Sequence, residues 1–264
     1  MVKRLIKLIL SSFYFLYLKF NDILRRNIKK VFLILYYHSV SSSEMNNFIK
    51  QLVYLKNRFN IIKLIDFNNI KKDSINVSIT FDDGLLSVLQ NAQPELVKRK
   101  IPFTVFVPSG YLGKVPDWDI DSIKKSVTEP VMTLEQLNQL NKEYCTIGSH
   151  TVNHKILTSL SLDEAKTELQ SSKEELEKLL NTKIELFSFP YGAYNLKLIQ
   201  LAKETGYKGL YTINTSFAST DETAYLFGRI AVSPTDWLFE LFLKINGGYN
   251  WIGWLQKRKY LKKH

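Results

Sequence analysis

The stretch Thr80-Phe81-Asp82-Asp83-Gly84 places two adjacent carboxylates at the end of an apolar run. That run, Val77 to Phe81, is typical of a short buried strand. Neighbouring residues on a strand point to opposite faces, so a regular strand could not direct both carboxylates at one site. We therefore expect the strand to end here, with Gly84 permitting a turn. Two charges in such a place are costly unless they are paired or bound to a cation, although a turn with two solvated acids has the same sequence.

A second polar stretch, Ser149-His150-Thr151-Val152-Asn153-His154, contains two of the chain's four histidines. Their i, i+4 spacing lets two imidazoles converge on one ion if the backbone is helical or tightly turned. Two histidines and one carboxylate, with a fourth position for water, form the ligand pattern of a catalytic zinc-like site. A histidine pair alone is more often structural. The metal-site interpretation therefore depends on the acidic pair and on a later turn, Pro190-Tyr191-Gly192.

The three motifs TFDDG (80–84), HTVNH (150–154) and FPYG (189–192), in this order, resemble those of the polysaccharide deacetylase family, the NodB-like carbohydrate esterases. The resemblance covers roughly residues 32 to 232. It implies an α/β fold, the family's deformed (β/α)7 barrel, and a hydrolase that removes N-acetyl groups from amino sugars. Strands that alternate with helices predict a parallel sheet by themselves, but they do not distinguish a barrel from an open sheet.

The resemblance also implies roles for individual residues. Asp83, His150 and His154 would bind a divalent metal ion, Zn first, with Co or Ni as alternatives. The ion would acidify a water and polarise the carbonyl of the substrate. Asp82 would be the general base that takes the proton of the water. Tyr191 would help to form the oxyanion site through its backbone N–H.

Two departures from the family pattern matter. Many members have an arginine at the start of the third motif, where this chain has Ser188, and that arginine orients the base. Arg229, in Gly228-Arg229-Ile230, is the candidate substitute, and a surface or structural arginine is the alternative. The late Leu-x-His motif of the family is also missing, since the only histidine after His154 is His264, in a basic tail.

The stretch Tyr36-Tyr37-His38-Ser39-Val40 suggests where the missing acid lies. It resembles the opening of a subgroup with circularly permuted motifs, which includes exopolysaccharide deacetylases of biofilms. In that subgroup the acid histidine precedes the aspartates. The resemblance therefore makes His38 the general acid that protonates the leaving amine. If His38 is instead structural, the acid is unidentified.

The net charge of +11 is concentrated at the two ends of the 264-residue chain. Residues 1–30 carry eight Lys or Arg against one Asp, and residues 254–264 carry five and no acid, which leaves about −1 for the rest. We therefore expect a nearly neutral catalytic domain, 31–234, between a basic and apolar N-terminal helix, 1–30, and an aromatic and basic C-terminal extension, 235–264. A nucleic-acid binder more often carries its basic surface on the folded body, so no nucleic-acid partner is expected.

Basic ends that contain aromatic residues fit an anionic membrane surface. The apolar stretch Leu8 to Leu18 is shorter than the about 20 residues that a membrane span needs, and no small-x-small cleavage site follows it. Lys3, Lys7 and Ser11 give this apolar helix a polar stripe. An interfacial helix is the first interpretation, followed by an uncleaved signal anchor and a helix that packs on its own domain. The C-terminal aromatics would equally suit a dimer interface or a packing helix.

Together these features predict a membrane-associated enzyme of the bacterial cell envelope that deacetylates a surface glycan or its lipid-linked precursor. A deacetylase of peptidoglycan or of an O-acylated sugar is the alternative within the same chemistry. An alternative of another class is a catalytically silent carbohydrate-binding protein on the same barrel. The intact acidic and histidine pairs argue against it, because a binding module needs no buried base and no metal ligands. The amino sugar, the membrane face and the oligomeric state stay open.

Overall fold

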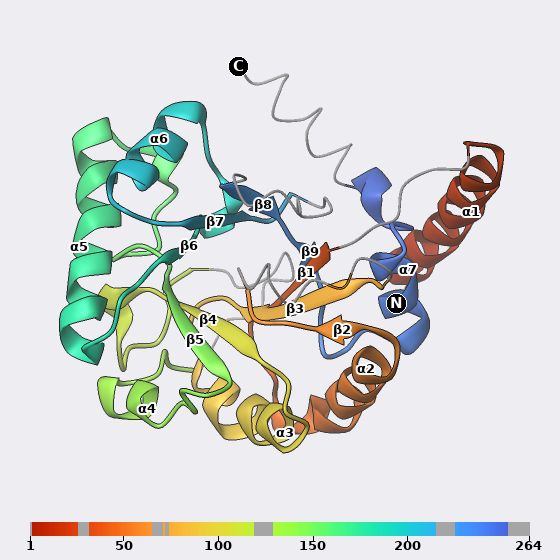
Figure 1. The fold of residues 1–264 in the computed structure, drawn as a ribbon, viewed down its shortest axis with the longest axis horizontal. Coiled ribbons are helices and arrows are strands. Elements are labelled where there is room, and N and C mark those ends of the chain that lie inside the picture. Colours follow the sequence, from red (N-terminus) through yellow and green to blue (C-terminus); the bar gives the residue numbers. More distant parts are fainter. Residues whose placement is uncertain are drawn as a thin grey trace.

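A computed structural model describes residues 2–25, 32–64, 71, 74–118, 129–214 and 225–252. Within these residues, parallel strands form one sheet in the order β8-β7-β6-β5-β4-β3-β1-β9, with β2 beside β3 (Figure 1). The strands are β1 (Phe32–Tyr37), β2 (Asn60–Ile61), β3 (Asn76–Phe81), β4 (Phe103–Val107), β5 (Cys145–Ser149), β6 (Leu186–Ser188), β7 (Gly209–Thr212), β8 (Leu226–Gly228) and β9 (Ile230–Ala231).

The two ends of this strand order are joined by a single residue. β8 pairs with β7 and ends at Gly228, whereas β9 pairs with β1 and begins at Ile230. Only Arg229 lies between them, and consecutive Cα atoms are about 3.8 Å apart, so the two edges of the sheet must approach each other. The sheet therefore curls almost into a closed barrel. If β8 and β9 are counted as one interrupted strand and the short β2 is set aside, the described residues form seven strands, and the predicted deformed α/β barrel is confirmed.

Helices surround the sheet, and their ends follow the signals in the sequence (Figure 1). They are α1 (Val2–Arg25), α2 (Met45–Arg58), α3 (Gln93–Lys98), α4 (Leu134–Asn138), α5 (Leu162–Leu180), α6 (Leu196–Glu204) and α7 (Leu238–Ile245), with short turns η1 (Ser42–Glu44), η3 (Val88–Ala92), η4 (Ser109–Tyr111), η5 (Leu157–Ser159) and η6 (Pro190–Gly192). Thr133 and Ser161 each begin a capping box, at α4 and α5. Pro94 lies in the first turn of α3, where it separates that helix from η3.

The side chains of β1 divide between two cores. Leu33, Leu35 and Tyr37 belong to the large apolar cluster that also contains buried residues of α2, α5 and α6. Phe32 and Ile34 belong to a second cluster. That cluster draws its other members from β4, β6, β7 and β8 and from the segment after β2: Ile62, Leu64, Phe106, Leu186, Tyr211 and Phe227. Because alternate residues of a strand face opposite sides, the second cluster fills the barrel interior, which is a packed core.

Helix α1 rests on the C-terminal part of the chain through a narrow stripe. Arg4 pairs with Glu240, and its Nε donates to Oε1 at 2.8 Å. Trp251 Nε1 donates to Ser11 Oγ at 3.0 Å, and Ser11 is fully buried. The predicted polar stripe does not face solvent along its whole length: Lys7 is exposed, but Ser11 faces the domain, where its hydroxyl accepts the hydrogen bond from the Trp251 indole N–H. Among the described helices none is long and apolar enough to cross a membrane.

Candidate active site

The candidate residues gather where neighbouring strands end. The register of β1 and β3 pairs Tyr37 with Phe81, so His38 and Asp82 follow at the same edge. The Asp82 N–H donates to the carbonyl of Tyr37 at 2.9 Å, which continues this register by one residue. In the same way the His150 N–H, after β5, donates to the carbonyl of Val107 at the end of β4 at 3.0 Å. Carboxyl ends of parallel strands are the usual position of the chemistry in barrels.

The acidic pair lies in a turn, as the sequence predicts. Strand β3 ends at Phe81, and Asp83 and Gly84 have φ of 66° and 61°, in the left-handed region. This turn points both carboxylates into the molecule, so that Asp82 is 3% and Asp83 1% exposed. The alternative of two solvated acids is therefore wrong. Two buried carboxylates side by side require compensating positive charge.

The histidine pair reaches one point because its backbone is tightly turned and not helical. Thr151 and His154 have φ of 67° and 52°, a costly conformation for residues with a side chain. The Nε2 atoms of His150 and His154 lie 3.6 Å and 3.3 Å from Asp83 Oδ1. One ligand atom from each of the three residues lies within 4.8 Å of the others.

This buried triad fits a divalent metal ion. Asp83 Oδ1 has no hydrogen-bond partner among the described residues, although it is buried. Burial raises the pKa of Asp83 against the opposing effect of His38 and His150, so a cation nearby would favour the ionised form. His150 Nδ1 donates to the carbonyl of Ser188 at 2.7 Å, which leaves the Nε2 lone pair free to bind a metal. Burial, followed by the charge of His150, lowers the pKa of His154 to about 2, so His154 is in the neutral form that a metal requires.

Two residues outside the three motifs hold the histidine turn, and the sequence reasoning missed the first of them, Glu168. Glu168, on α5, is 6% exposed, and its carboxylate accepts hydrogen bonds from Val152 N (2.9 Å), Asn153 N (2.8 Å) and Asn153 Nδ2 (2.7 Å). Trp118 stacks on the His154 ring with 4.1 Å between ring centroids and 16° between planes. In the sequence, Glu168 belongs to the long charged face of α5, so nothing there separates it from solvated acids.

Arg229 is completely buried in the barrel and binds Asp82 through two hydrogen bonds. Its Nη1 and Nη2 donate to Asp82 Oδ1 and Oδ2, each at 2.7 Å. The guanidinium also lies over the rings of Tyr36 and Phe106, 4.8 Å and 5.3 Å from their centroids. Burial alone would raise the pKa of Asp82, but Arg229, with His150 and His38, lowers it to about 2. The alternative of a surface arginine is therefore wrong, and orientation of the base by Arg229 stays a prediction.

Ser188 explains how Arg229 can lie there. Its Oγ accepts from Arg229 Nη2 at 2.7 Å, while its carbonyl accepts from His150 Nδ1. Thr80 Oγ1 accepts from Arg229 Nη1 at 3.1 Å. A small side chain at 188, where the family resemblance leads one to expect arginine, leaves room for a guanidinium from β8–β9. Ser188, which departs from the family pattern, is thus hydrogen-bonded to Arg229, the candidate substitute for the arginine that it replaces.

The structure brings His38 and Tyr191 to the same edge as the triad. His38 is half-buried directly after β1, and its charge lowers the pKa of Asp82 as well as that of His154. The ring of Tyr191 lies 4.9 Å from that of His154, and Tyr191 has a φ of 55° within η6. The backbone N–H of Tyr191 is therefore carried on a turn beside the triad. The tail that contains His264 and residues 26–31 lie outside the described residues.

Comparisons with known proteins agree with this fold and identify the family. The model of the polysaccharide deacetylase family matches residues 69–210. A Bacillus subtilis (strain 168) protein, YxkH, which carries a provisional assignment as a polysaccharide deacetylase, is 30% identical over 158 residues, 60% of this chain and 52% of that protein. The chain thus matches about half of the length of that relative.

Two further proteins match more of their own length. The poly-beta-1,6-N-acetyl-D-glucosamine N-deacetylase of Staphylococcus aureus (strain MRSA252) is 26% identical over 220 residues, 81% of this chain and 73% of that protein. The solved structure of the Streptococcus pyogenes deacetylase PplD, in complex with acetate, is 26% identical, has a TM-score of 0.66, and covers 81% of this chain and 97% of its own. The family match spans more than half of the chain and includes the acidic and histidine motifs, and the chain belongs to the polysaccharide deacetylase family.

Proposed function

We propose that this protein is a metal-dependent hydrolase that removes N-acetyl groups from amino sugars of a cell-surface polysaccharide or its lipid-linked precursor. One observation carries the proposal: a buried carboxylate held by arginine, Asp82, lies next to a buried Asp83–His150–His154 triad. The similarity to the Staphylococcus aureus poly-beta-1,6-N-acetyl-D-glucosamine N-deacetylase supports an N-acetylated glucosamine polymer as the substrate class. An acetamide is a poor electrophile, so its hydrolysis needs the activation that such a site provides.

Asp82 is built to act as a fixed proton acceptor. When bound, a divalent ion at the triad, Zn before Co or Ni, would polarise the acetyl carbonyl and acidify a water. Each carboxylate oxygen offers two acceptor sites, and Arg229 occupies one on each, which leaves one on each for the proton of the water. The low pKa keeps Asp82 ionised at neutral pH but makes it a weak base. It therefore orients the water and holds its proton only briefly.

His38 and Tyr191 complete the proposed chemistry. His38, at the end of β1 next to Asp82, would give a proton to the nitrogen of the leaving amine. The backbone N–H of Tyr191, on the turn beside His154, would stabilise the negative oxygen that develops on the acetyl carbon. Both roles place a donor where charge changes during the reaction.

We also propose that the enzyme works in the bacterial cell envelope, close to a membrane. The support is the concentration of positive charge at both ends of a nearly neutral domain. A surface glycan and its lipid-linked precursor would both be found there.

The decisive experiment measures acetate release with and without added Zn, Co or Ni. The substrates are oligomers of β-1,6-linked N-acetylglucosamine, a lipid-linked N-acetylhexosamine, peptidoglycan fragments and an O-acetylated sugar. Metal-dependent release that Asp82→Asn abolishes is the expected result, and the preferred substrate separates the alternatives. Tight metal binding without release from any substrate would instead favour a silent carbohydrate-binding protein. A protein that binds no metal would contradict the proposal.

A further inference from the structure

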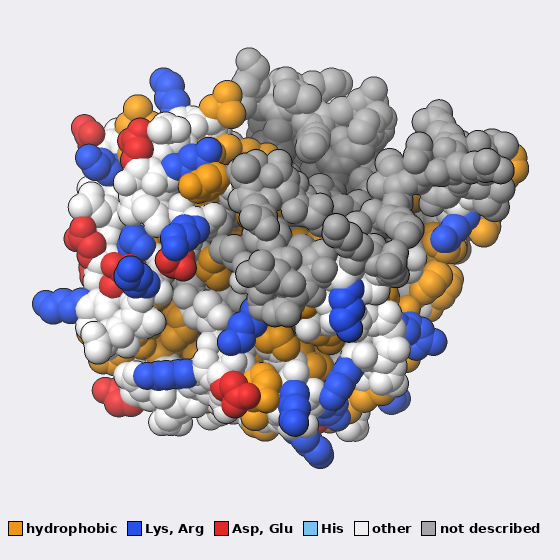
Figure 2. Space-filling model, viewed as in Figure 1, with side chains coloured by type: hydrophobic (Ala, Val, Ile, Leu, Met, Phe, Trp, Pro, Cys, Tyr) orange, Lys and Arg blue, Asp and Glu red, His pale blue; other side chains and the backbone are white. Residues whose placement is uncertain are grey.

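Helix α1 exposes a continuous apolar face to solvent. Nine of its aliphatic and aromatic side chains are between 48% and 72% exposed: Val2, Leu5, Ile6, Ile9, Leu10, Phe13, Leu16, Tyr17 and Phe20. Exposed apolar patches of this extent on a soluble domain mark a binding surface. Figure 2 shows hydrophobic side chains along the arm that α1 forms at one side of the molecule, with Lys and Arg beside them.

The apolar face points directly away from the domain. The stripe that contacts the domain contains Arg4, Ser11 and Phe15, and the Phe15 ring meets that of Phe242 edge-on at 5.2 Å. Residues in a helix are separated by about 100°, so Phe13 lies about 200° from Ser11, on the opposite side. Phe13 is 68% exposed, whereas Ser11 is fully buried. One side of α1 thus contacts the domain, and the opposite, apolar side is exposed to solvent.

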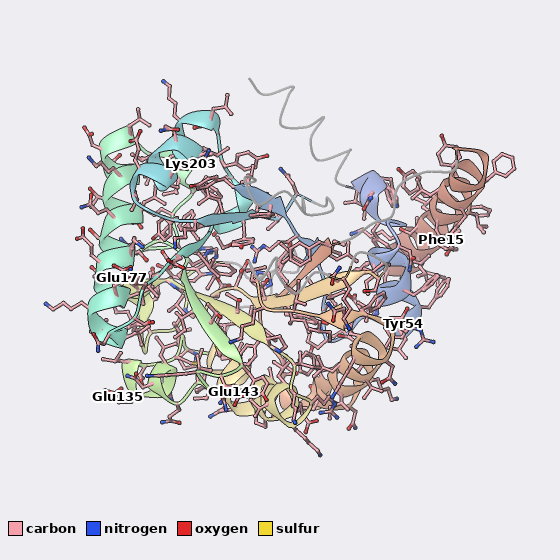
Figure 3. All side chains as sticks on the ribbon, in the orientation of Figure 1. Phe15, Tyr54, Glu135, Glu143, Glu177 and Lys203 are labelled. Carbon is pink, nitrogen blue, oxygen red and sulfur yellow. The ribbon has the colours of Figure 1, made fainter. Side chains whose placement is uncertain are left out.

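Positive charge borders the exposed face. Lys7 and Lys19 are exposed and lie about 60° to either side of the contact stripe, between it and the apolar face. Residues 1–21 contain no acidic side chain. By contrast, Figure 3 places Glu135 and Glu177 at the opposite side of the molecule from Phe15 and Tyr54. The surface that contains α1 is therefore apolar at its centre and cationic at its edges.

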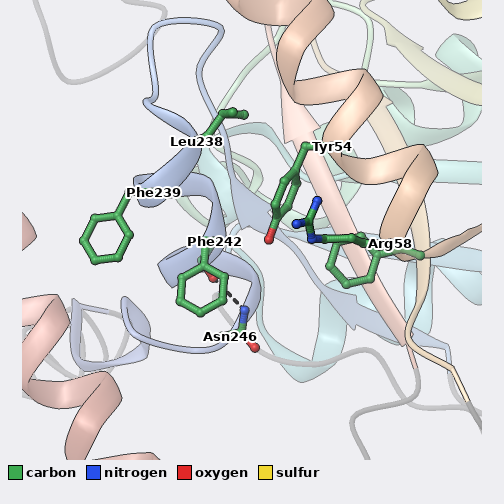
Figure 4. A pocket seen from close by; sticks show the side chains of 7 residues that line it. Tyr54, Arg58, Leu238, Phe239, Phe242 and Asn246 are labelled. Atoms are coloured by element: carbon green, nitrogen blue, oxygen red, sulfur yellow. Dashed lines mark hydrogen bonds between the residues drawn. The ribbon is translucent and has the colours of Figure 1, made fainter.

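The start of α7 and a neighbouring groove extend this surface. Trp237, Leu238 and Phe239 are 49%, 38% and 52% exposed, and Arg4 lies over the Trp237 ring, 4.6 Å from its centroid. An open groove of about 660 Å³ lies between α2 and α7, and Figure 4 shows aromatic side chains and the Arg58 guanidinium along it. Its lining residues include one cation and no acid.

We infer that the apolar face of α1, together with the start of α7, docks this protein on an anionic lipid bilayer, with α1 lying along the membrane surface. An apolar face with cationic edges complements the acyl region and the anionic headgroups of such a bilayer. Two copies of α1 would instead bring lysines together without acidic partners, which disfavours a dimer through this face. The basic residues 254–264 are likewise disfavoured as the partner of this face, because their positive charges would be repelled by Lys7 and Lys19. The inference is independent of the deacetylase chemistry.

Vesicle co-sedimentation of the full chain tests this docking. Vesicles of phosphatidylcholine are compared with vesicles of equal parts phosphatidylcholine and phosphatidylglycerol, at low and high salt. We expect binding to the anionic vesicles that weakens with salt, and a loss of about tenfold or more in the partition coefficient for Ile9→Glu/Phe13→Glu. Leu196→Glu, at an 83% exposed leucine on α6, is the matched control and should bind as the wild type does. Metal binding by each variant reports whether the domain is folded, separately from acetate release.

Lys7→Gln/Lys19→Gln keeps the apolar face and supplies a second test. It should weaken binding to the anionic vesicles and leave binding to phosphatidylcholine unchanged. A wild-type chain that binds neither vesicle overturns the inference. The inference is also overturned if the wild type binds no vesicle and light scattering shows that it is a dimer which Phe13→Glu converts to a monomer. Equal binding by wild type and Ile9→Glu/Phe13→Glu would also overturn it.

Discussion

Arg229 and Asp82 are 147 positions apart in sequence, yet the guanidinium holds both oxygens of the carboxylate at 2.7 Å. The pair forms because Arg229 is the single residue between β8 and β9, where the two edges of the curled sheet meet. A residue at the junction of β8 and β9, with its side chain inside the barrel, can reach the end of β3. The residue that joins the two edges of the sheet is therefore also the one that binds the candidate base.

Removal of Arg229 should destabilise the protein strongly. Arg229→Ala leaves the buried Asp82 charge without its partner, which costs about 3–5 kcal/mol. Urea unfolding followed by circular dichroism measures this loss. Asp82→Asn/Arg229→Ala should recover part of the stability, because no uncompensated charge remains. A double variant no more stable than Arg229→Ala would show that the ion pair is not the cause.

The catalytic effect of Arg229 should be separable from its effect on stability. Arg229→Lys keeps the positive charge but cannot hold two oxygens with fixed geometry. We expect this variant to stay folded and to lose about 10²-fold in kcat, because a small misplacement of a catalytic group has an effect of this size. Metal affinity, measured by calorimetry, should change little. A wild-type kcat for Arg229→Lys would mean that Arg229 only compensates charge.

Metal should stabilise the folded chain through the Asp83–His150–His154 triad. At a free Zn concentration of 100 times Kd, the free energy of unfolding should rise by about 2.7 kcal/mol. Thermal unfolding with and without Zn, and after treatment with a chelator, measures the increase. His154→Ala should remove it, whereas Leu196→Glu should retain it. An equal increase in His154→Ala would place the metal elsewhere.

Glu168 should control metal affinity although it binds no metal in our assignment. Its carboxylate holds the turn between His150 and His154 through hydrogen bonds from Val152 and Asn153. Glu168→Ala should weaken Zn binding by about tenfold or more, because groups that position metal ligands have effects of 10 to 100-fold. The absorption spectrum of the Co-loaded protein should change as well. Glu175→Gln is the control, because Glu175 lies on the same helix but accepts a hydrogen bond from Ser109. It should leave the Zn affinity and the Co spectrum unchanged.

His38 should matter only for substrates with a poor leaving group. His38→Ala should reduce hydrolysis of an N-acetylhexosamine by about 10²–10⁴-fold, the usual contribution of a general acid. An aryl acetate needs no proton on its leaving group, so its hydrolysis should be nearly unaffected. A comparison of kcat for the two substrates makes the test. Equal losses for both would indicate that His38 is structural or that it acts before the amine leaves.

The attachment of α1 should weaken in acid. Burial raises the pKa of Glu240, but the hydrogen bond from Arg4, the N–H of Trp237 and the charges of Arg4 and Lys244 lower it below its ordinary 4.5. A lowered carboxyl pKa means that the stabilisation is complete above pH 4.5 and is lost as the pH falls through the folded-state pKa. Hydrogen-exchange protection factors of α1 should therefore decrease in that range. Glu240→Gln should give low protection at both neutral and acid pH, and a wild-type pH response in this variant would contradict the assignment.

Local features of the chain were readable from sequence because they depend on neighbours in the chain. The apolar run before Asp82 predicts β3 and its end, and the capping pairs at Thr133 and Ser161 predict where α4 and α5 begin. The i, i+4 spacing of His150 and His154 indicates a shared ligand point. The spacing alone could not choose between a helix and a tight turn, since both bring the two imidazoles together.

Tertiary structure alone decided which distant groups meet. The family resemblance made Arg229 a candidate partner of Asp82, but only the fold excluded a surface arginine. Nothing local in the sequence distinguishes Glu168 from the solvated acids of α5, or shows that Ser11 faces the domain and Phe13 faces away from it. These relationships depend on how strands and helices from different parts of the chain are placed against one another. Hydrophobic periodicity defines which side of an element is buried, but it does not specify which residue of another element lies opposite, because apolar contacts are not directional.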